Sequence, residues 1–314
     1  MEYVFLVISL VLIIFGATLL TDGSVALAAR FKVSEFVVGL TIVAVGTSMP
    51  ELVVSALSAL SGSGEMAIGN VVGSNIFNVY AILGLCAVVA PVLLTRSNMR
   101  SDIPICILAS VALWGVTVYD NVITRWEGAL LLFFYILMLF YSIRQSRKEG
   151  AAVSADGEED AQSAKSMPAW RIPVWILGGL GMLIYGGQLC VDSATEIARN
   201  LGVSEATIAI TLVAGGTSLP ELAASLVSLI KGRGGLALGN VLGSNIANIL
   251  LILGVSSLIT PLSMGNITMI DIAVAVSAPV LVLLSGLFIG DKRITRLEGA
   301  IFLLIFVGYI YTLI

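Results

Sequence analysis

The chain has 314 residues, of which 58% are hydrophobic and only 11% are charged, with a formal net charge of −4. A soluble domain carries about 25% charged residues, whereas one transmembrane helix needs about 20 consecutive apolar residues. Apolar segments of that length recur from one end of the sequence to the other, which excludes a single soluble core. The chain contains no histidine, so it lacks the side chain that most often relays protons or binds transition metals near neutral pH.

Ten apolar segments, separated by charged, proline or glycine breaks, predict an all-α integral membrane protein with ten transmembrane helices. They cover residues 3–29, 34–60, 65–91, 101–119, 123–143, 171–198, 203–230, 235–260, 267–289 and 296–313. The first is interpreted as a retained span, because no basic region precedes it and no small-residue cleavage site follows a short core. Cys86, Cys106 and Cys190 lie within or at the ends of these segments and are expected to be buried hydrophobic residues.

One long polar stretch, residues 144–168, separates the fifth predicted helix from the sixth. Its alanine, serine, glycine and acidic residues are typical of a flexible linker. We therefore divide the chain into a first five-helix repeat, 1–145, a linker, 146–170, and a second five-helix repeat, 171–314.

The two halves are copies of one another. Residues 33–85 align with residues 203–255 without a gap, at an offset of 170, and 28 of these 53 positions are identical. A second match relates residues 123–129 to residues 294–300. Because each half has an odd number of helices, the second copy is predicted to lie inverted in the membrane. Inverted repeats are typical of secondary transporters, which bind their substrates near the midplane, where the repeats meet.

The basic residues predict the orientation of the chain. If the N-terminus is outside the cell, the predicted cytoplasmic segments hold 14 of the 16 lysine and arginine residues, namely Arg30, Lys32, Arg96, Arg100, Arg144, Arg147, Lys148, Lys165, Arg171, Lys231, Arg233, Lys292, Arg293 and Arg296. Only Arg125 and Arg199 remain outside. This bias follows the positive-inside rule. We expect a multi-pass protein of the cell membrane with extracellular or periplasmic termini and a cytoplasmic linker.

The best-preserved duplicated segments are also the most polar ones within the predicted helices. The second helix carries Gly-Thr-Ser-Met-Pro-Glu at 46–51, and the seventh carries Gly-Thr-Ser-Leu-Pro-Glu at 216–221. The third helix carries Gly-Asn-Val-Val-Gly-Ser-Asn-Ile-Phe-Asn at 69–78, and the eighth carries Gly-Asn-Val-Leu-Gly-Ser-Asn-Ile-Ala-Asn at 239–248.

Proline predicts a break in the second and seventh helices. Pro50 has no N–H and leaves the carbonyl of Gly46 without its helical donor, and Pro220 does the same to Gly216. At membrane depth such a break is tolerated only where the backbone is covered by protein or lines a polar cavity. Each break is therefore expected to adjoin a functional cavity.

Oxygen-bearing side chains surround the first break and recur at the second. Thr47 and Ser48 precede Glu51 by four and three residues, so all three side chains are expected to face one point. Hard cations prefer such oxygens, and calcium takes about 6–8 of them. A charged glutamate at the bilayer centre costs at least about 3 kcal/mol. A bound divalent cation would neutralise Glu51 and Glu221 together, which predicts an intramembrane cation site. Alternatively, one or both glutamates could be protonated when the site is empty.

Other duplicated residues have structural interpretations. The glycines of the Gly-xxx-Gly pairs are expected to be close-packing contacts between helices, at Gly69, Gly73, Gly239 and Gly243. Asp22 and Asp192 are expected to be interfacial or bonded to a partner. Ser55 and Ser58 follow Glu51 on one helix face, and Ser225 and Ser228 repeat this stripe. The stripes either line an extracellular and a cytoplasmic ion path, respectively, or pack the helices together.

The paired motifs resemble the two α-repeats of the cation/calcium exchanger family, across both repeats, the ten-helix layout and the linker. The resemblance implies sodium/calcium antiport by alternating access around a site in helices two, three, seven and eight. It implies the side-chain ligands Glu51, Glu221, Thr47, Ser48, Thr217, Ser218, Ser74, Ser244, Asn78 and Asn248, together with the backbone carbonyls of Ala44, Thr47, Ala214 and Thr217. Calcium and sodium are then transported ions in a lipid bilayer, with no cofactor, no nucleic acid and no obligate protein partner expected.

One position departs from the family pattern. Many sodium-coupled members, including potassium-dependent ones, have an aspartate at the position of Asn248, whereas both repeats here end in asparagine. The site therefore has two carboxylates in place of three, which argues against potassium co-transport and leaves a proton-coupled exchanger of calcium or another divalent cation as an alternative. A channel would show flux without a counter-ion. An intramembrane enzyme is disfavoured by the missing histidine, zinc-ligand cluster and Gly-x-Ser-x-Gly motif.

Overall fold

The computed structural model describes residues 1–118, 121–153, 167–202, 214–289 and 292–313. The helices of the first repeat are α1 Glu2–Phe31, α2 Glu35–Val38, α3 Ala44–Thr47, α4 Met49–Leu60, α5 Gly64–Ile76, α6 Gly84–Val89, α7 Ile103–Val118 and α8 Arg125–Val153. Those of the second are α10 Arg171–Asn200, α12 Ala214–Gly216, α13 Leu219–Ile230, α14 Gly234–Ile246, α15 Leu253–Ile259, α16 Met269–Leu284 and α17 Arg296–Leu313. Segments of π-helix continue several of them: η1 Gly39–Val43, η2 Phe77–Leu83, η3 Asn98–Asp102, η5 Ala247–Ile252 and η6 Ser285–Ile289.

The all-α membrane class is confirmed. Within the described ranges, eight helices are long and apolar enough to cross a bilayer, and the bent pair Glu35–Thr47 and Met49–Leu60 makes a ninth span. The predicted span 203–230 is described only from residue 214 onward, where Leu219–Ile230 is a shorter apolar helix. Residues 203–213 lie outside the described part of the chain, so the count of ten stays a prediction.

The central elements of the bundle are the third and eighth predicted spans. About 72% of the apolar window of Gly64–Val89 and 78% of that of Gly234–Ile259 is buried, against 17–39% for the other six long apolar helices that the structure describes. Each of these two spans passes from α-helix into π-helix and back, as α5–η2–α6 and as α14–η5–α15. The polar motifs of the sequence therefore lie at the centre of the protein.

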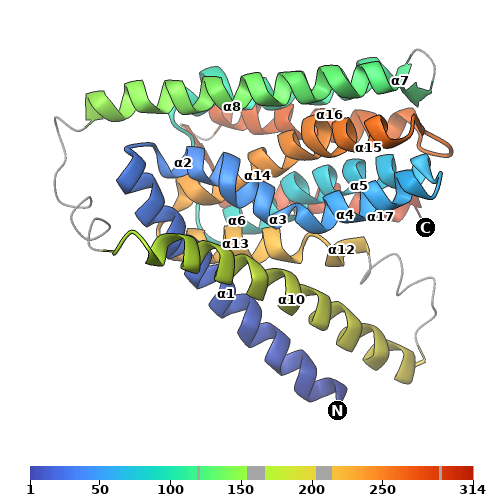
Figure 1. The fold of residues 1–314 in the computed structure, drawn as a ribbon, viewed down its shortest axis with the longest axis horizontal. Helices are drawn as coiled ribbons and strands as arrows, with labels where there is room; N and C mark the ends of the chain where they lie inside the picture. Colours follow the sequence, from blue (N-terminus) through green and yellow to red (C-terminus); the bar gives the residue numbers. More distant parts are fainter. Residues whose placement is uncertain (119–120, 154–166, 203–213, 290–291, 314) are drawn as a thin grey trace.

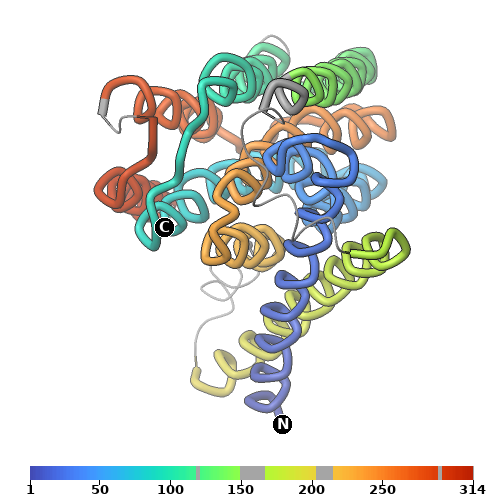
Figure 2. Tube along the Cα trace, turned by 90° about the vertical axis from the view of Figure 1, so that its left-hand side faces the viewer, coloured from blue at the N-terminus to red at the C-terminus, as the bar shows by residue number. Residues whose placement is uncertain are grey.

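The first helices of the two repeats, α1 and α10, form a separate pair. They lie side by side and slant away from the other helices (Figures 1 and 2). The backbones meet where Gly16 faces Gly179: a Cβ on Gly16 would lie 2.9 Å from the carbonyl oxygen of Gly179, and the reverse distance would be 2.7 Å. Only glycine allows this approach without displacing a backbone.

Two short antiparallel sheets join the repeats to each other. Strand β1 (Val92–Leu93) pairs with β4 (Arg293–Ile294), and β2 (Val122–Ile123) pairs with β3 (Leu262–Ser263). In each sheet one strand comes from the first repeat and the other from the second. Backbone hydrogen bonds between strands therefore connect the two repeats at two places, in addition to the packing of their helices.

The duplicated Thr-Arg-x-Glu segment at the start of α8 and of α17 has the same structural role in both repeats. The backbone N–H of Thr124 donates to Glu127 Oε2 at 2.7 Å, and the N–H of Glu127 donates to Thr124 Oγ1 at 3.4 Å, as in a capping box. Arg125 donates to the carbonyl oxygen of Ile259 at the end of α15, at 3.1 Å. The second repeat makes the same contacts through Thr295, Glu298, Arg296 and Val89.

Candidate cation site

Both predicted helix breaks are present, and each is centred on a serine. The helical segments before and after Ser48 meet at an angle of 48°, and Pro50 lies in the first turn of α4. In the second repeat Ser218 precedes α13, which has Pro220 in its first turn. A proline at the start of a helix loses no hydrogen bond, because the N–H groups of the first turn have no helical partner. The helix therefore ends and restarts at the predicted break.

The serines at the breaks bind the carboxylates of the opposite repeat. Ser48 Oγ donates to Glu221 Oε1 at 2.9 Å, and Ser218 Oγ donates to Glu51 Oε1 at 3.1 Å. Glu51 is 1% exposed and Glu221 is 0% exposed. The two carboxylates are thus buried together inside the protein and are held by reciprocal bonds across the repeats.

Four asparagines form a second reciprocal connection, of which Asn75 and Asn245 were not predicted as site residues. Asn75 Nδ2 donates to the carbonyl oxygen of Asn245 at 3.3 Å, and Asn245 Nδ2 donates to that of Asn75 at 3.2 Å. Their side-chain oxygens accept bonds of 3.0 Å from the amide nitrogens of Asn78 and Asn248. The amide nitrogens of Asn78 and Asn248 are therefore bonded to the opposite repeat, and their Oδ1 atoms do not take part in these bonds.

Five of the predicted ligands carry a buried oxygen that has no hydrogen-bond partner in the described part of the chain. These atoms are Glu51 Oε2, Glu221 Oε2, Asn78 Oδ1, Asn248 Oδ1 and Ser244 Oγ. A buried polar atom without a partner costs about 1–3 kcal/mol, and more when it is charged. Such oxygens are the ligands that a hard cation would take. Among the described residues no three acidic, cysteine or histidine side chains cluster, so the site offers two carboxylates and otherwise neutral oxygens.

The remaining predicted ligands lie around this group. Thr47 Oγ1 lies within donor distance of the carbonyl oxygen of Val43, at 3.1 Å, of Asn240 Oδ1, at 3.2 Å, and of the carbonyl oxygen of Ala44, at 3.3 Å. The Ala44 carbonyl also accepts the N–H of Ser48 at 3.0 Å. The Ala44 carbonyl is therefore already bonded within the helix and keeps at most one lone pair for a cation. Ala214 lies in α12, and nothing of its side chain is described.

Comparison with known proteins assigns the chain to a family. Residues 1–144 and 171–314 match the family model described as sodium/calcium exchanger protein. The chain belongs to the sodium/calcium exchanger family. CaxA of Alkalimonas amylolytica is 38% identical over 318 residues, which cover 99% of this chain and 98% of that protein. Sodium/calcium exchanger MaX1 of Methanosarcina acetivorans is 30% identical, with coverage of 99% and 98%.

The fold of this family member also matches a solved structure. The sodium-calcium exchanger NCX_Mj, soaked with zero Na⁺ and Ca²⁺, aligns with a TM-score of 0.84 at 31% sequence identity. The alignment covers 100% of this chain and 99% of NCX_Mj.

A cleft of about 860 Å³ enters this exchanger-family chain from one end of the bundle. Ser63 and Glu65, at the start of α5, and Ser263, in β3, lie along it, and its lining includes Ser74 and Thr217, two predicted ligands. The cleft thus extends from the surface to two of the predicted ligands.

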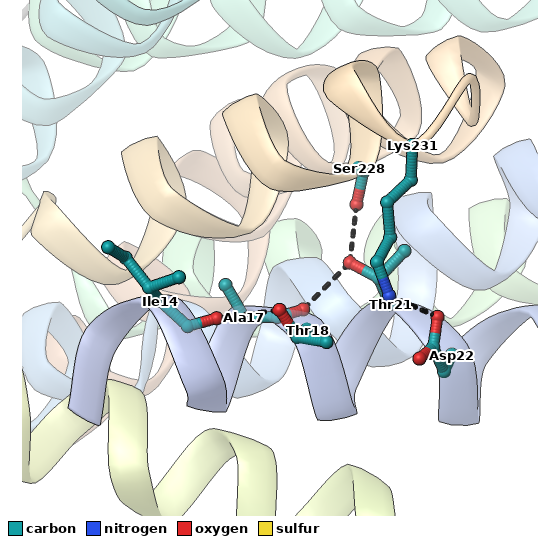
Figure 3. Close-up of polar contacts among 7 residues, drawn as sticks. All are labelled: Ile14, Ala17, Thr18, Thr21, Asp22, Ser228 and Lys231. Carbon is teal, nitrogen blue, oxygen red and sulfur yellow. Dashed lines mark hydrogen bonds and ion pairs between the residues drawn. The ribbon is translucent and has the colours of Figure 1, made fainter. Parts of the chain in front are cut away.

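Polar contacts join α1 and α13 at the end of α13 that lies away from the cleft. The hydroxyls of Thr21 in α1 and Ser228 in α13 are 2.9 Å apart, and beside them Lys231 Nζ lies 2.5 Å from Asp22 Oδ1 (Figure 3). The prediction that Asp22 is bonded to a partner is confirmed. It also holds for Asp192, which accepts a bond of 2.9 Å from Gln188.

The serine stripes pack helices together, and the ion-path interpretation is not supported. Ser55 is 0% exposed, and its Oγ accepts a bond of 2.9 Å from Asn70 Nδ2, which also donates to the carbonyl oxygen of Glu51 at 3.2 Å. The copies Ser225, Asn240 and Glu221 make the same contacts. Asn70 and Asn240 therefore hold the glutamate helices. These asparagines, like Asn75 and Asn245, are identical in the two repeats, and this identity could have marked them as part of the site.

The close-packing interpretation of the duplicated glycines is confirmed in α14. A Cβ on Gly243 would collide with the carbonyl oxygen of Leu40 in η1, and Gly239 is packed in the same way. Their copies, Gly73 and Gly69, line the cleft. The copy of η1 in the second repeat falls within residues 203–213, outside the described part of the chain, so for α5 the interpretation stays a prediction.

Proposed function

We propose that this protein exchanges sodium for calcium across the membrane, with one cation site presented alternately to the two sides. The observation that carries the proposal is the group of buried, unpartnered oxygens around Glu51 and Glu221, at the point where the inverted repeats meet. A divalent cation would offset both carboxylates and occupy the free oxygens, and sodium uses the same kind of ligand. MaX1 and NCX_Mj, which match almost the whole chain, are named as sodium/calcium exchangers.

We propose that the predicted ligands bind the transported ions. Glu51 and Glu221 supply the charge, and the free oxygens of Asn78, Asn248 and Ser244 surround them. Thr47, Thr217, Ser48, Ser218 and Ser74 complete the polar shell, with the backbone carbonyls of Ala44 and Ala214. Asn75 and Asn245 position Asn78 and Asn248 and do not bind the ion themselves.

Access from one side at a time distinguishes this carrier from a channel. The cleft reaches Ser74 and Thr217 from one end, while the Asp22–Lys231 ion pair and the packed Gly243 cover the other end. An inverted repeat can exchange the conformations of its two halves, which opens the covered end and covers the open one. A channel would need both ends open together.

The coupling ion is tested in liposomes that contain the purified protein. Calcium uptake is measured while sodium, proton and potassium gradients are imposed one at a time. Uptake is expected only with an outward sodium gradient. Uptake driven by a pH gradient without sodium would establish the proton-coupled alternative, and flux that needs no counter-ion would indicate a channel.

Potassium is expected to be neither required nor transported. With asparagine at 78 and 248, the site has a formal charge of at most −2, which calcium alone neutralises, and an added potassium would leave an uncompensated buried charge. Asn248→Asp adds a carboxylate but also removes the N–H that donates to Asn75 Oδ1. We therefore expect this variant to change ion preference or pH dependence more than expression, with Asn78→Asp as the matched variant. Wild-type exchange that stops when potassium is omitted, at a clamped membrane potential, would contradict this expectation.

We further propose that the repeats 1–145 and 171–314 are joined by a cytoplasmic linker, 146–170, whose first residues, 146–153, continue α8, and that both termini lie outside. The cleft then opens to the outside. A cysteine at Ser154, which lies outside the described residues, is expected to react with a membrane-impermeant thiol reagent only from the cytoplasmic side, in a background without the native cysteines. Reaction from outside in intact cells would reverse the orientation.

A further inference from the structure

The duplication has left different charges at the two ends of the site. At the open end α5 begins with Glu65, whose copy in the second repeat is Gly235. At the closed end Lys231 and Arg233 precede α14, and their copies in the first repeat are the uncharged Ser61 and Ser63. Otherwise equivalent helix ends are therefore acidic on one side and basic on the other.

Glu65 lies on the route to the cation site. It is half-buried and lines the cleft, and it is the one ionisable side chain among the described residues of that lining. Its Oε1 accepts a bond of 3.0 Å from Asn266 Nδ2, and its other oxygen lies against Gly265. Both neighbours precede α16, so the carboxylate is held at the mouth by uncharged groups.

The carboxylates at the opposite end are already paired. Lys231 Nζ lies 2.5 Å from Asp22 Oδ1, and Arg233 Nη1 lies 2.9 Å from Glu35 Oε1. Each pair is neutral, so these two carboxylates are compensated, whereas no basic side chain is among the described residues that line the cleft beside Glu65.

We propose that Glu65 attracts calcium into the open cleft and so raises the apparent affinity for calcium on that side of the membrane alone; this rests on the proposed sodium/calcium exchange. A fixed charge that lines a cleft raises the local concentration of a counter-charged substrate. The interaction scales with the charge of the ion, so calcium gains more than sodium. Salt screens it, because the carboxylate is in contact with water.

The test compares Glu65→Gln with wild type in right-side-out and inverted membrane vesicles. Initial rates of sodium-driven calcium uptake give KM and the maximal rate from each side. At low ionic strength we expect KM for calcium to rise about three- to tenfold where the Glu65 mouth faces the medium, without a matching fall in maximal rate. KM for sodium should rise less. The difference should disappear at high ionic strength, and Glu65→Asp should keep the wild-type KM.

Asp192→Asn is the matched control, because Asp192 is an exposed carboxylate of α10 that does not line the cleft. It should leave KM unchanged. The proposal is overturned if Glu65→Gln leaves KM unchanged at low ionic strength. It is equally overturned if KM changes from both sides, or if the change persists at high ionic strength, as a structural role would predict. A wild-type protein without sodium-driven uptake would instead refute the proposed function.

Discussion

Replacing either Glu51 or Glu221 with glutamine is expected to abolish sodium-driven calcium uptake and to leave a folded protein. Glutamine keeps the size of the side chain and an oxygen that accepts the bond from Ser218 or Ser48. It removes one of the two charges that offset a divalent ion, and an uncompensated charge in a buried site costs about 3–5 kcal/mol. Uptake should therefore fall at least about 100-fold. The measurement is calcium uptake into liposomes, beside the elution profile of each purified variant.

Ser218→Ala separates the charge from its hydrogen bond. It removes the donor to Glu51 but leaves both carboxylates in place, so uptake should fall less than in the glutamine variants, in line with the loss of one bond to a charged group, which is worth about 1.5–3 kcal/mol. Near-normal uptake in either glutamine variant would mean that the cation site lies elsewhere in the bundle.

Leucine at Gly73 is expected to stop exchange while calcium binding persists. Gly73 is exposed in the cleft, so the larger side chain fits this conformation. Its copy Gly243 is covered by η1 so closely that a Cβ would collide with Leu40. If the open end closes in the same way as the covered end, leucine at 73 blocks that closure. Exchange should fall at least about tenfold, because overpacking at such a contact costs about 1–3 kcal/mol or more.

The counterpart variant should act in the opposite sense. Gly243→Leu collides in the present conformation and should favour the one with the cleft closed, so a cysteine at Ser63 should be labelled more slowly than in Gly73→Leu. Gly308→Leu is the matched control: Gly308 is exposed in α17, no described atom lies within 4 Å of its Cβ position, and it does not line the cleft. Normal exchange by Gly73→Leu would show that the glycine surface of α5 is never covered.

The membrane class, the helix breaks and the pair of buried glutamates were predictable from the sequence. Long apolar segments require membrane helices, and proline fixes where Pro50 and Pro220 interrupt them. The pair of glutamates was predictable from the duplication, because Glu51 and Glu221 occupy equivalent positions in the two repeats. These features depend on local chemistry and spacing, which a single sequence contains.

The support for the ligands was not predictable. Whether Asn75 or Asn78 faces the ion depends on the phase of the helix, which η2 changes by its wider π-helical turn. The serine stripe followed ideal helical spacing, but Ser55 packs against α5 through Asn70. The open and covered ends differ although their sequences are copies, because the two conformations of a carrier are separated by only a few kcal/mol.

Equilibrium binding of calcium to the purified protein, with sodium as a competitor, tests the central claim most directly. If Glu51 and Glu221 form one site that both ions share, calcium should bind saturably, sodium should displace it, and Glu51→Gln and Glu221→Gln should each lose this binding. Gly73→Leu should retain it. Calcium binding that sodium does not displace, or that survives in both glutamine variants, would contradict a shared site at the meeting point of the repeats.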